Sequence, residues 1–509
     1  MCRADIKHAS WLAWFAGLGV LAHALAIHGQ SLPYTTDELQ YFAWSRDLKW
    51  GFFSKPPGIA VALWIWSKLD PLATELRLLA QVCYSISLLL SYKLMRDDGL
   101  SPARAATASL VLASTPLIGF AQWFFTTDAL LLIFWLLALA IAWRALRLPG
   151  SANAFKWWLL LGIIVALGVL SKHSMLFFWV GMLAYLVVNR SKIHDHWRGL
   201  LLCMVVFIAV LTPHMIWLLE HPGTTVQHLI DLQGRTAQPS PLGVDNQVLG
   251  RLVRGLGQAV EFLAAQWLGL GIAIFLAVRI KPGFSEFQRW LFVHSVTVVS
   301  IFVFQAIIGR ANANWALPAT FTLGLAIISN CLSPEGSGTG FKKVKVNSLR
   351  LGLWVLSNLM ISFFVSFGAQ GIKLFQPDAL LWIDRLDPFH RQRGWDQFDS
   401  ALAALNKPSS IPWGVSDRDS AARILHRYGD DQIVYRPLPG SKPNHFVLRY
   451  PYPIPDTEGL AEAKGKCVWF VAKKGAADQA PLADVIARVD RPRLSGRSEA
   501  WLVWTEHCK

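Results

Sequence analysis

Two adjacent carboxylates and a lysine stand close together in the segment 33–58. Asp37 and Glu38 follow the first long apolar run, and Lys55 precedes a double proline. Carboxylates are costly inside hydrocarbon, so at the edge of a membrane protein they indicate a functional site. A carboxylate can accept a proton from an attacking hydroxyl, and a lysine can neutralise a phosphate. This segment therefore predicts acid–base or phosphate chemistry beside a bilayer.

Further candidates stand in segments that separate other apolar runs. They are Asp128, Lys172, His228 and Arg235. Asp128 is a second candidate base, lysine and arginine neutralise a phosphate as a point charge and a fork, and His228 can join either role. Asp37, Asp128 and His228 are also candidate ligands of a divalent metal that stabilises a leaving phosphate. The residues alone leave the base and the metal roles open, and they establish no cofactor.

Each candidate also has a structural interpretation. Asp37 and Asp128 both follow threonines and can cap a helix. Lys172 can extend its stem along apolar surface and keep its charge at the interface. Tyr41, among the aromatics after the acidic pair, can stack on a sugar ring or lie at the headgroup level. We interpret Asn314 as an interface anchor.

Composition identifies the environment in which these residues act. The chain has 509 residues, of which 53% are hydrophobic and 16% charged. A soluble protein carries about a quarter charged residues, and a span needs ~20 mostly apolar ones. We predict a polytopic α-helical membrane protein with about eleven spans. They lie near 10–28, 74–95, 104–122, 127–146, 157–171, 174–189, 199–219, 258–279, 289–309, 314–332 and 349–370.

The formal charge of +15 follows from topology. Lysines and arginines gather in every second loop between the expected spans, which places those loops in the cytoplasm. We therefore expect no nucleic-acid partner, and we read the first apolar run as a retained span. All the candidate residues then fall on the opposite, outer face. Their gathering there is independent of the charges that set the topology.

The chain changes character after residue 370. We predict a transmembrane domain over 1–370 and a soluble α+β domain over 371–509, outside the membrane. Segments 432–437, 445–450, 466–474 and 501–508 are typical of strands, and 419–429 of a helix. Cys467 and Cys508 stand in two of these strands. In an oxidising compartment they can pair, and two unrelated thiols are the alternative.

The motifs resemble those of a known family. The segment from Asp37 to Gly58, DELQYFAWSRDLKWGFFSKPPG, is similar to the first-loop signature of bacterial membrane glycosyltransferases. These are related to the dolichyl-phosphate-mannose–protein mannosyltransferases and include the lipid A aminoarabinose transferases. FFTTDALL, LSKHSML and ANANWALP resemble later family segments in the same order, and the similarity covers roughly 34–318. Ser54 departs from the aminoarabinose transferases, which tend to carry an acidic residue before the lysine.

The resemblance implies a GT-C fold and inverting transfer of a sugar from a polyprenyl-phosphate donor. Asp37 and Glu38 match the family's acidic motif, and Asp128 matches its second acidic position. Lys55 and Lys172 match lysines that face the lipid phosphate or the acidic cluster. His228 and Arg235 match a less constrained region. The departure at residue 54 leaves metal coordination and the donor sugar open.

We therefore expect a transferase of the bacterial inner membrane, surrounded by membrane lipids, with its active site and C-terminal domain in the periplasm. The partners would be a polyprenyl-phosphate-sugar donor and a lipid, glycan or protein acceptor. A flippase for a lipid-linked sugar is the main alternative. It would place charge near the membrane midplane and show repeated halves, and the sequence has neither pattern. A non-catalytic assembly subunit is the second alternative.

Overall fold

The computed structural model divides into two compact units. The first includes Lys49–Ile59 and the helices between Leu69 and Phe363. The second includes residues 32–48, Ala60–Lys68 and the described part of the chain from Phe364 onward. The residues that the structure describes are 32–69, 76–148, 152–221, 247–271, 283–309, 311–333, 348–375, 383–429, 433–436, 467–474 and 485–506.

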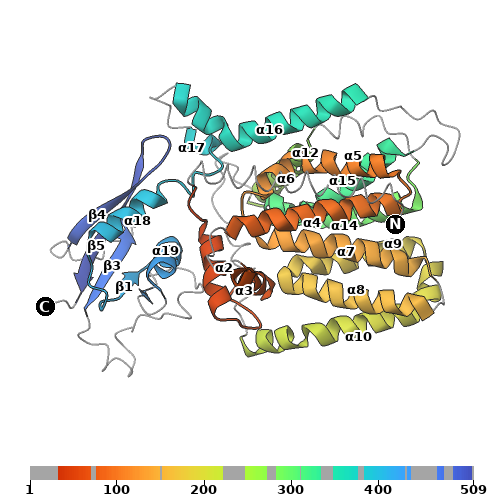
Figure 1. Cartoon of the computed structure of the whole chain (residues 1–509), viewed down its shortest axis with the longest axis horizontal. Coiled ribbons are helices and arrows are strands. Elements are labelled where there is room, and N and C mark those ends of the chain that lie inside the picture. Colours follow the sequence, from red (N-terminus) through yellow and green to blue (C-terminus); the bar gives the residue numbers. More distant parts are fainter. Residues whose placement is uncertain are drawn as a thin grey trace. The chain divides into compact units, whose positions relative to one another are not determined.

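The first unit is helical (Figure 1). Helix α7 packs between α4 and α8, α10 packs on α8, and α14 contacts α9, α12 and α15. Two further helices, α3 (Gly58–Leu69) and α16 (Ser348–Phe375), hold residues of both units. The bounds are α4 (Leu76–Asp97), α5 (Pro102–Ala113), α6 (Pro116–Ala121), α7 (Thr127–Leu146), α8 (Ala152–Ser171), η1 (His173–Leu176), α9 (Phe177–Val188), α10 (Ser191–Glu220), α12 (Gln247–Leu270), α14 (Glu286–Ile308), η2 (Ala313–Ala316) and α15 (Leu317–Leu332).

Within the described part of the chain, 7 helices are long and apolar enough to cross a membrane. They fall in α4, α7, α8, α10, α14, η2 with α15, and α16. The protein is a multi-pass membrane protein, as the composition predicts. The number of about eleven spans stays a prediction. The expected span 10–28 and part of 258–279 lie outside the described residues, and 174–189 corresponds to a shorter apolar helix.

The prediction of one continuous span over 104–122 is wrong. The segment forms two helices of 12 and 6 residues, α5 and α6, and neither is long enough to cross alone. Thr115, which lies between them, has an extended backbone with ψ of 144°. Pro116 explains the break, because a proline disfavours the helical conformation of the residue before it. Apolar composition alone does not reveal this interruption.

Buried indoles tie α7 to its neighbours. Trp135 Nε1 donates to Thr322 Oγ1 of α15 at 3.0 Å, and Trp290 Nε1 of α14 donates to the Leu139 carbonyl at 3.3 Å. Both tryptophans are almost fully buried. Inside a bilayer polar groups must find partners within the protein, so these bonds fix helix positions as well as satisfying donors. Helix α7 is thereby held firmly at the centre of the first unit.

The second unit contains a mixed five-stranded sheet with the strand order β2-β1-β3-β5-β4. Strand β1 pairs parallel to β2 and β3, and β5 pairs antiparallel to β3 and β4. The elements are α2 (Thr36–Arg46), α17 (Ile383–Leu386), α18 (Trp395–Ala404), β1 (Trp413–Val415), α19 (Arg418–Tyr428), β2 (Ile433–Tyr435), β3 (Val468–Lys473), β4 (Val485–Pro492) and β5 (Ser498–Glu506).

The prediction of a C-terminal domain with strands and a helix is confirmed. The predicted segments 432–437, 466–474 and 501–508 overlap β2, β3 and β5, and 419–429 overlaps α19. Segment 445–450 lies outside the described residues. Strands β1 and β4 are not predicted, because β1 has only 3 residues and β4 is interrupted by charged side chains. Cys467 is disulfide-bonded, whereas Cys508 lies outside the described part.

The core of the second unit joins residues far apart in the sequence. Leu39 and Ala43 of α2 belong to the same buried cluster as Phe398, Ile424 and Val503. The first-loop helix thus shares a hydrophobic core with the C-terminal sheet domain. The predicted domain boundary at residue 370 stays a prediction.

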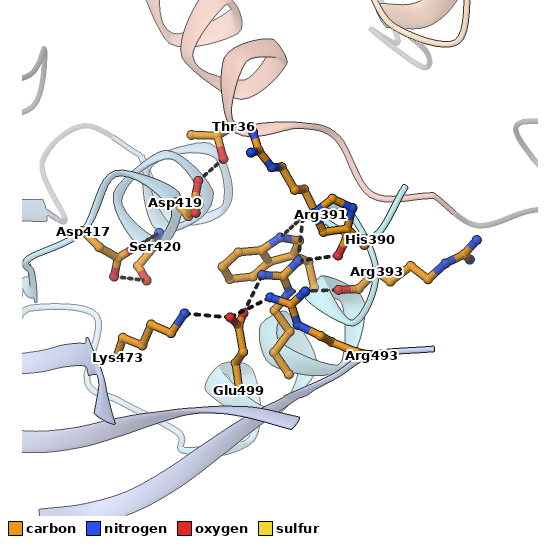
Figure 2. A network of polar contacts seen from close by, with 12 residues as sticks. Thr36, His390, Arg391, Arg393, Asp417, Asp419, Ser420, Lys473, Arg493 and Glu499 are labelled. Atoms are coloured by element: carbon orange, nitrogen blue, oxygen red, sulfur yellow. Dashed lines mark hydrogen bonds and ion pairs between the residues drawn. The ribbon is translucent and has the colours of Figure 1, made fainter. Parts of the chain in front are cut away.

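Two arginines and a glutamate add a polar layer to this core. Arg491 and Arg423 lie over the ring of the buried Trp395, at 4.2 and 4.4 Å from its centroid. Figure 2 shows Glu499 nearby, where it accepts from Lys473 and Arg493, and Glu499 also pairs with Arg491 at 3.0 Å. Buried charges are tolerated when they are paired, and Glu499 pairs with Lys473, Arg491 and Arg493.

Candidate active site

Asp128 lies in the first turn of α7, the central helix of the first unit. The Thr126 hydroxyl caps this helix and accepts from the Asp128 backbone amide at 3.3 Å. The residue is only 3% exposed. A negative charge at a helix N-terminus is favoured by the backbone dipoles, but a buried carboxylate also needs direct partners.

Lys172 and Asn314 supply those partners. Lys172 Nζ lies 2.5 Å from Asp128 Oδ1, and Asn314 Nδ2 donates to Asp128 Oδ2 at 2.9 Å. The lysine follows α8 and the asparagine lies in η2. The structure therefore brings together two residues that the sequence singles out, Asp128 and Lys172. It adds Asn314, whose interpretation as an interface anchor does not anticipate this contact.

Tyr84 completes the surroundings of Asp128. It lies on α4, is 6% exposed, and is close enough to Asp128 to interact electrostatically. Its hydroxyl has no hydrogen-bond partner within the described residues. A buried unpaired hydroxyl is costly, so one beside a charged cluster is a candidate to bind a substrate oxygen. The sequence gives no sign of this, because Tyr84 stands inside an ordinary apolar run.

The first loop docks on α10 through Gly51. A Cβ at residue 51 would lie 2.1 Å from Cε3 of Trp217, so only glycine permits this approach. The Trp50 carbonyl lies 2.6 Å from Nδ1 of His214, also on α10. The contacts fix the chain just before Lys55, whose backbone exchanges two hydrogen bonds with Phe52.

Lys55 and Lys172 both lie near His173. Lys55 is close enough to interact electrostatically with His173, the residue after Lys172. The Nε2 atoms of His173 and His214 are 3.1 Å apart. Two lysines of the first unit thus converge at the junction of α8 and η1. Such an arrangement can neutralise an anionic group such as a phosphate.

The acidic pair belongs to the second unit, on α2. Thr35 caps this helix, and its backbone amide donates to Glu38 Oε2 at 2.8 Å, while the Glu38 amide donates back to the threonine hydroxyl at 3.1 Å. Glu38 is 1% exposed. This reciprocal pair is a capping box, so Glu38 helps to begin the helix. The sequence suggests a capping role for Asp37, whereas in the structure the neighbouring Glu38 has that role.

Asp37 is directed outward from the same helix turn. Its side chain is 54% exposed, and Oδ1 accepts from Nη2 of Arg418 on α19. Tyr41, one turn further along, is 3% exposed, with its ring centroid 5.5 Å from that of Trp44. The roles predicted for Asp37, Glu38 and Tyr41 stay predictions. Arg418 is missed in the sequence, because it stands in a polar domain with many charges.

A metal site is not evident among these residues. Within the described ranges no three histidine, cysteine, aspartate or glutamate side chains gather. Both carboxylate oxygens of Asp128 already accept hydrogen bonds. One donor is the Lys172 ammonium, which occupies the position that a metal ion would take. In this arrangement Asp128 does not suit the role of a metal ligand, and the proposed mechanism includes no step on a metal. His228 and Arg235 lie outside the described residues.

The family described as dolichyl-phosphate-mannose-protein mannosyltransferase matches residues 54–217. The matched segment contains Lys55, Asp128 and Lys172. Over 311 residues the chain is 30% identical to lipid A galacturonosyltransferase RgtD of Rhizobium johnstonii, an alignment that covers 59% of this chain and 61% of that protein. This chain is similar to these membrane glycosyltransferases over part of its length. The alignment spans less than two thirds of the relative's length.

The GT-C fold extends over almost the whole chain. The crystal structure of ArnT from Cupriavidus metallidurans in the apo state matches with a TM-score of 0.61 and 16% identity, covering 96% of this chain and 97% of that one. The same protein bound to undecaprenyl phosphate matches with a TM-score of 0.58 and 15% identity over the same shares. The resemblance and the fold class predicted from the sequence are confirmed.

Proposed function

We propose that the protein is an inverting glycosyltransferase that moves a single sugar from a polyprenyl-phosphate donor to a periplasmic acceptor. The observation that carries this proposal is the Asp128–Lys172–Asn314 cluster at the N-terminal end of α7. Its two charged members, Asp128 and Lys172, lie within the segment matched by the mannosyltransferase family. A lipid A galacturonosyltransferase among the relatives, and an ArnT structure bound to undecaprenyl phosphate, support a lipid-linked donor and a lipid acceptor.

In the proposed reaction an acceptor oxygen attacks the anomeric carbon of the sugar. The bond between that carbon and the phosphate oxygen breaks, and polyprenyl phosphate leaves with the electron pair. Lys55 and Lys172 would neutralise the charge that develops on the leaving phosphate. Asp128 and Asn314 would hold Lys172 in place, since a fixed cation costs less reorganisation than a mobile one.

Asp37 is the proposed base. It would take the proton of an acceptor hydroxyl as the new bond forms. Its exposed carboxylate can be reached from solvent, unlike the buried Glu38, which already helps to cap α2. If the acceptor group is itself a phosphate, as on lipid A, no proton need be removed and Asp37 would orient the acceptor instead.

The test is transfer of labelled sugar from purified polyprenyl-phosphate donors in proteoliposomes. We expect the wild type to move label to an acceptor or to water, and Asp37→Asn to lower turnover by about 100-fold, within the range that general-base catalysis supplies. The yield of folded Asp37→Asn protein should match the wild type. Label that crosses the bilayer still attached to its carrier would instead identify a flippase, and wild-type turnover by Asp37→Asn would remove this residue from the mechanism.

A further inference from the structure

Helix α2 is seated on α19 within the second unit. The rings of Tyr34, just before α2, and of Phe42, within α2, both contact the ring of His426, with centroid distances of 6.1 and 5.0 Å. Arg423 of α19 donates to the Tyr34 carbonyl at 2.6 Å. Figure 2 shows the Thr36 hydroxyl directed at the Asp419 carboxylate, to which it donates. The acidic helix is therefore held along its length by the C-terminal domain.

Arg418 makes the contact closest to the proposed chemistry. Its Nε donates to Gln40 Oε1 at 2.9 Å, and its Nη2 donates to both Gln40 and Asp37. Gln40 is 2% exposed, so its amide is a fixed point for the guanidinium. Arg418 is also the first residue of α19, directly after the capping residue Asp417, whose Oδ1 accepts from the Ser420 amide at 2.9 Å.

The Asp37–Arg418 pair contributes little to stability. The two side chains are 54% and 43% exposed, and exposed ion pairs stabilise by only about 0–1 kcal/mol. What holds α2 on α19 is the shared buried cluster that includes Leu39, Ala43 and Ile424. Neutralising Arg418 should therefore leave the fold intact. The substitution would instead change the position and the charge of the Asp37 carboxylate.

We propose that Arg418 is a positioning residue through which the C-terminal domain holds the Asp37 carboxylate in its reactive geometry and keeps it ionised. The proposal rests on the proposed function, which makes Asp37 the base. A neighbouring guanidinium favours the ionised form of a carboxylate. Among the described charged and titratable groups, Arg418 pairs with Asp37, and Tyr41 of α2 and Asp419 of α19 interact electrostatically with the same guanidinium. The residues matched to the mannosyltransferase family, 54–217, include neither Asp37 nor Arg418.

The first test compares full-length Arg418→Gln with the wild type in proteoliposomes. We expect kcat to fall about tenfold with the KM for the donor unchanged, because α2 and not the donor site is affected. The acidic limb of the pH–rate profile should move to higher pH by about half a unit, a small shift because the pair is partly exposed and solvent screens it. Arg418→Lys keeps a charge but loses the fork, so it should recover only part of kcat.

Arg427→Gln is the matched control. Arg427 lies on the same helix, with its guanidinium over the ring of the neighbouring Tyr428 at 5.9 Å. This variant should keep the wild-type kcat and pH profile. Equal kcat and an equal pH profile for Arg418→Gln and the wild type would overturn the proposal. So would a loss of transfer that comes with a lower melting temperature and an unmoved acidic limb, because that combination marks a purely structural role.

A second readout does not depend on transfer. Carbodiimide coupling of an amine to Asp37, followed by peptide mass spectrometry, should be faster in Arg418→Gln, because the pairing guanidinium is gone. Equal labelling in the two proteins would overturn the proposal. Absence of transfer by the wild type would instead overturn the proposed function, even if the labelling of Asp37 changes as expected.

Discussion

At the scale of single residues, the Lys172–Asp128 pair has a predictable effect on the free energy of unfolding. Both side chains are largely buried, at 12% and 4% exposed. Removing one member of a buried pair is destabilising by about 3–5 kcal/mol, because it leaves the other charge uncompensated. Replacing both with uncharged groups avoids that cost. The pair is thus a test of the structure that needs no substrate.

We predict that Lys172→Met lowers the melting temperature of the detergent-purified protein, and that Lys172→Met combined with Asp128→Asn restores much of the loss. Intrinsic tryptophan fluorescence during heating is the measurement. Both proteins should fail to transfer sugar, because the cation is missing in each. A single variant as stable as the double would show that Asp128 does not depend on Lys172.

At the scale of elements, the docking of the first loop on α10 depends on a glycine. We predict that Gly51→Ala raises the donor KM, since the added methyl meets the rigid Trp217 ring and displaces the segment leading to Lys55. Removing the ring in Gly51→Ala/Trp217→Ala should return the KM toward that of Trp217→Ala alone.

Gly257→Ala is the control for this substitution. Gly257 lies in α12 with open space where a Cβ would stand, so alanine should be neutral or slightly stabilising there, by roughly 0.5–1 kcal/mol. Wild-type KM in Gly51→Ala would mean that the loop accommodates the methyl group without moving.

Strand β5 should show a pH dependence that originates at Glu499. Burial acts to raise the pKa of Glu499, but hydrogen bonds from Lys473 and Arg493 outweigh it and hold the pKa below its usual value of 4.5. The ionised form is therefore bound more strongly in the folded state. Its contribution to stability is present above about pH 4.5 and is lost as the pH falls through the lowered pKa.

We predict that Glu499→Gln flattens this dependence. The melting temperature of the wild type, followed by near-ultraviolet circular dichroism of the tryptophans, should fall between pH 5 and pH 3. The variant should start lower at pH 7 and change less over the same range. Parallel curves for the two proteins would assign the acid sensitivity to other groups.

Sequence patterns could predict the elements better than their contacts. Long apolar runs identify α4, α7, α10 and α14, because a membrane-spanning helix needs little beyond length and composition. The same runs hide the break at Thr115, which depends on one proline. Asp128 and Lys172 are found because a charge beside a span is unusual. Tyr84 is missed because only its position beside Asp128 in the folded protein suggests a function, and no sequence pattern reports that position.

At the scale of the whole molecule, the second unit combines α2 with a sheet domain that follows it by hundreds of residues. No local pattern reveals this, since Leu39 and Ala43 are ordinary members of a short helix and gain meaning only from Phe398 and Ile424. A hydrophobic cluster built from distant segments is beyond sequence periodicity, which reports only on neighbours along one element.

We predict that a chain ending after Phe375 still inserts into the membrane but leaves α2 exposed. Its apolar side chains would lose the cluster that buries them in the full-length protein. Limited proteolysis with mass spectrometry should then find cleavage within 32–48 in the truncated chain and not in the full-length one. Equal protection in both would mean that α2 is held without the C-terminal domain.

The pairing of α2 with α19 also has a consequence for biosynthesis. Asp37 and Arg418 are separated by 381 positions in the chain. At about 5–20 residues per second, the ribosome completes that interval in roughly 20–80 seconds. During this time the acidic helix has been made but the surface that buries Leu39 and Ala43 has not. The proposed base therefore reaches its working geometry only after Arg418 and the strands that follow it have been made, so a chain terminated before them would be inserted but inactive.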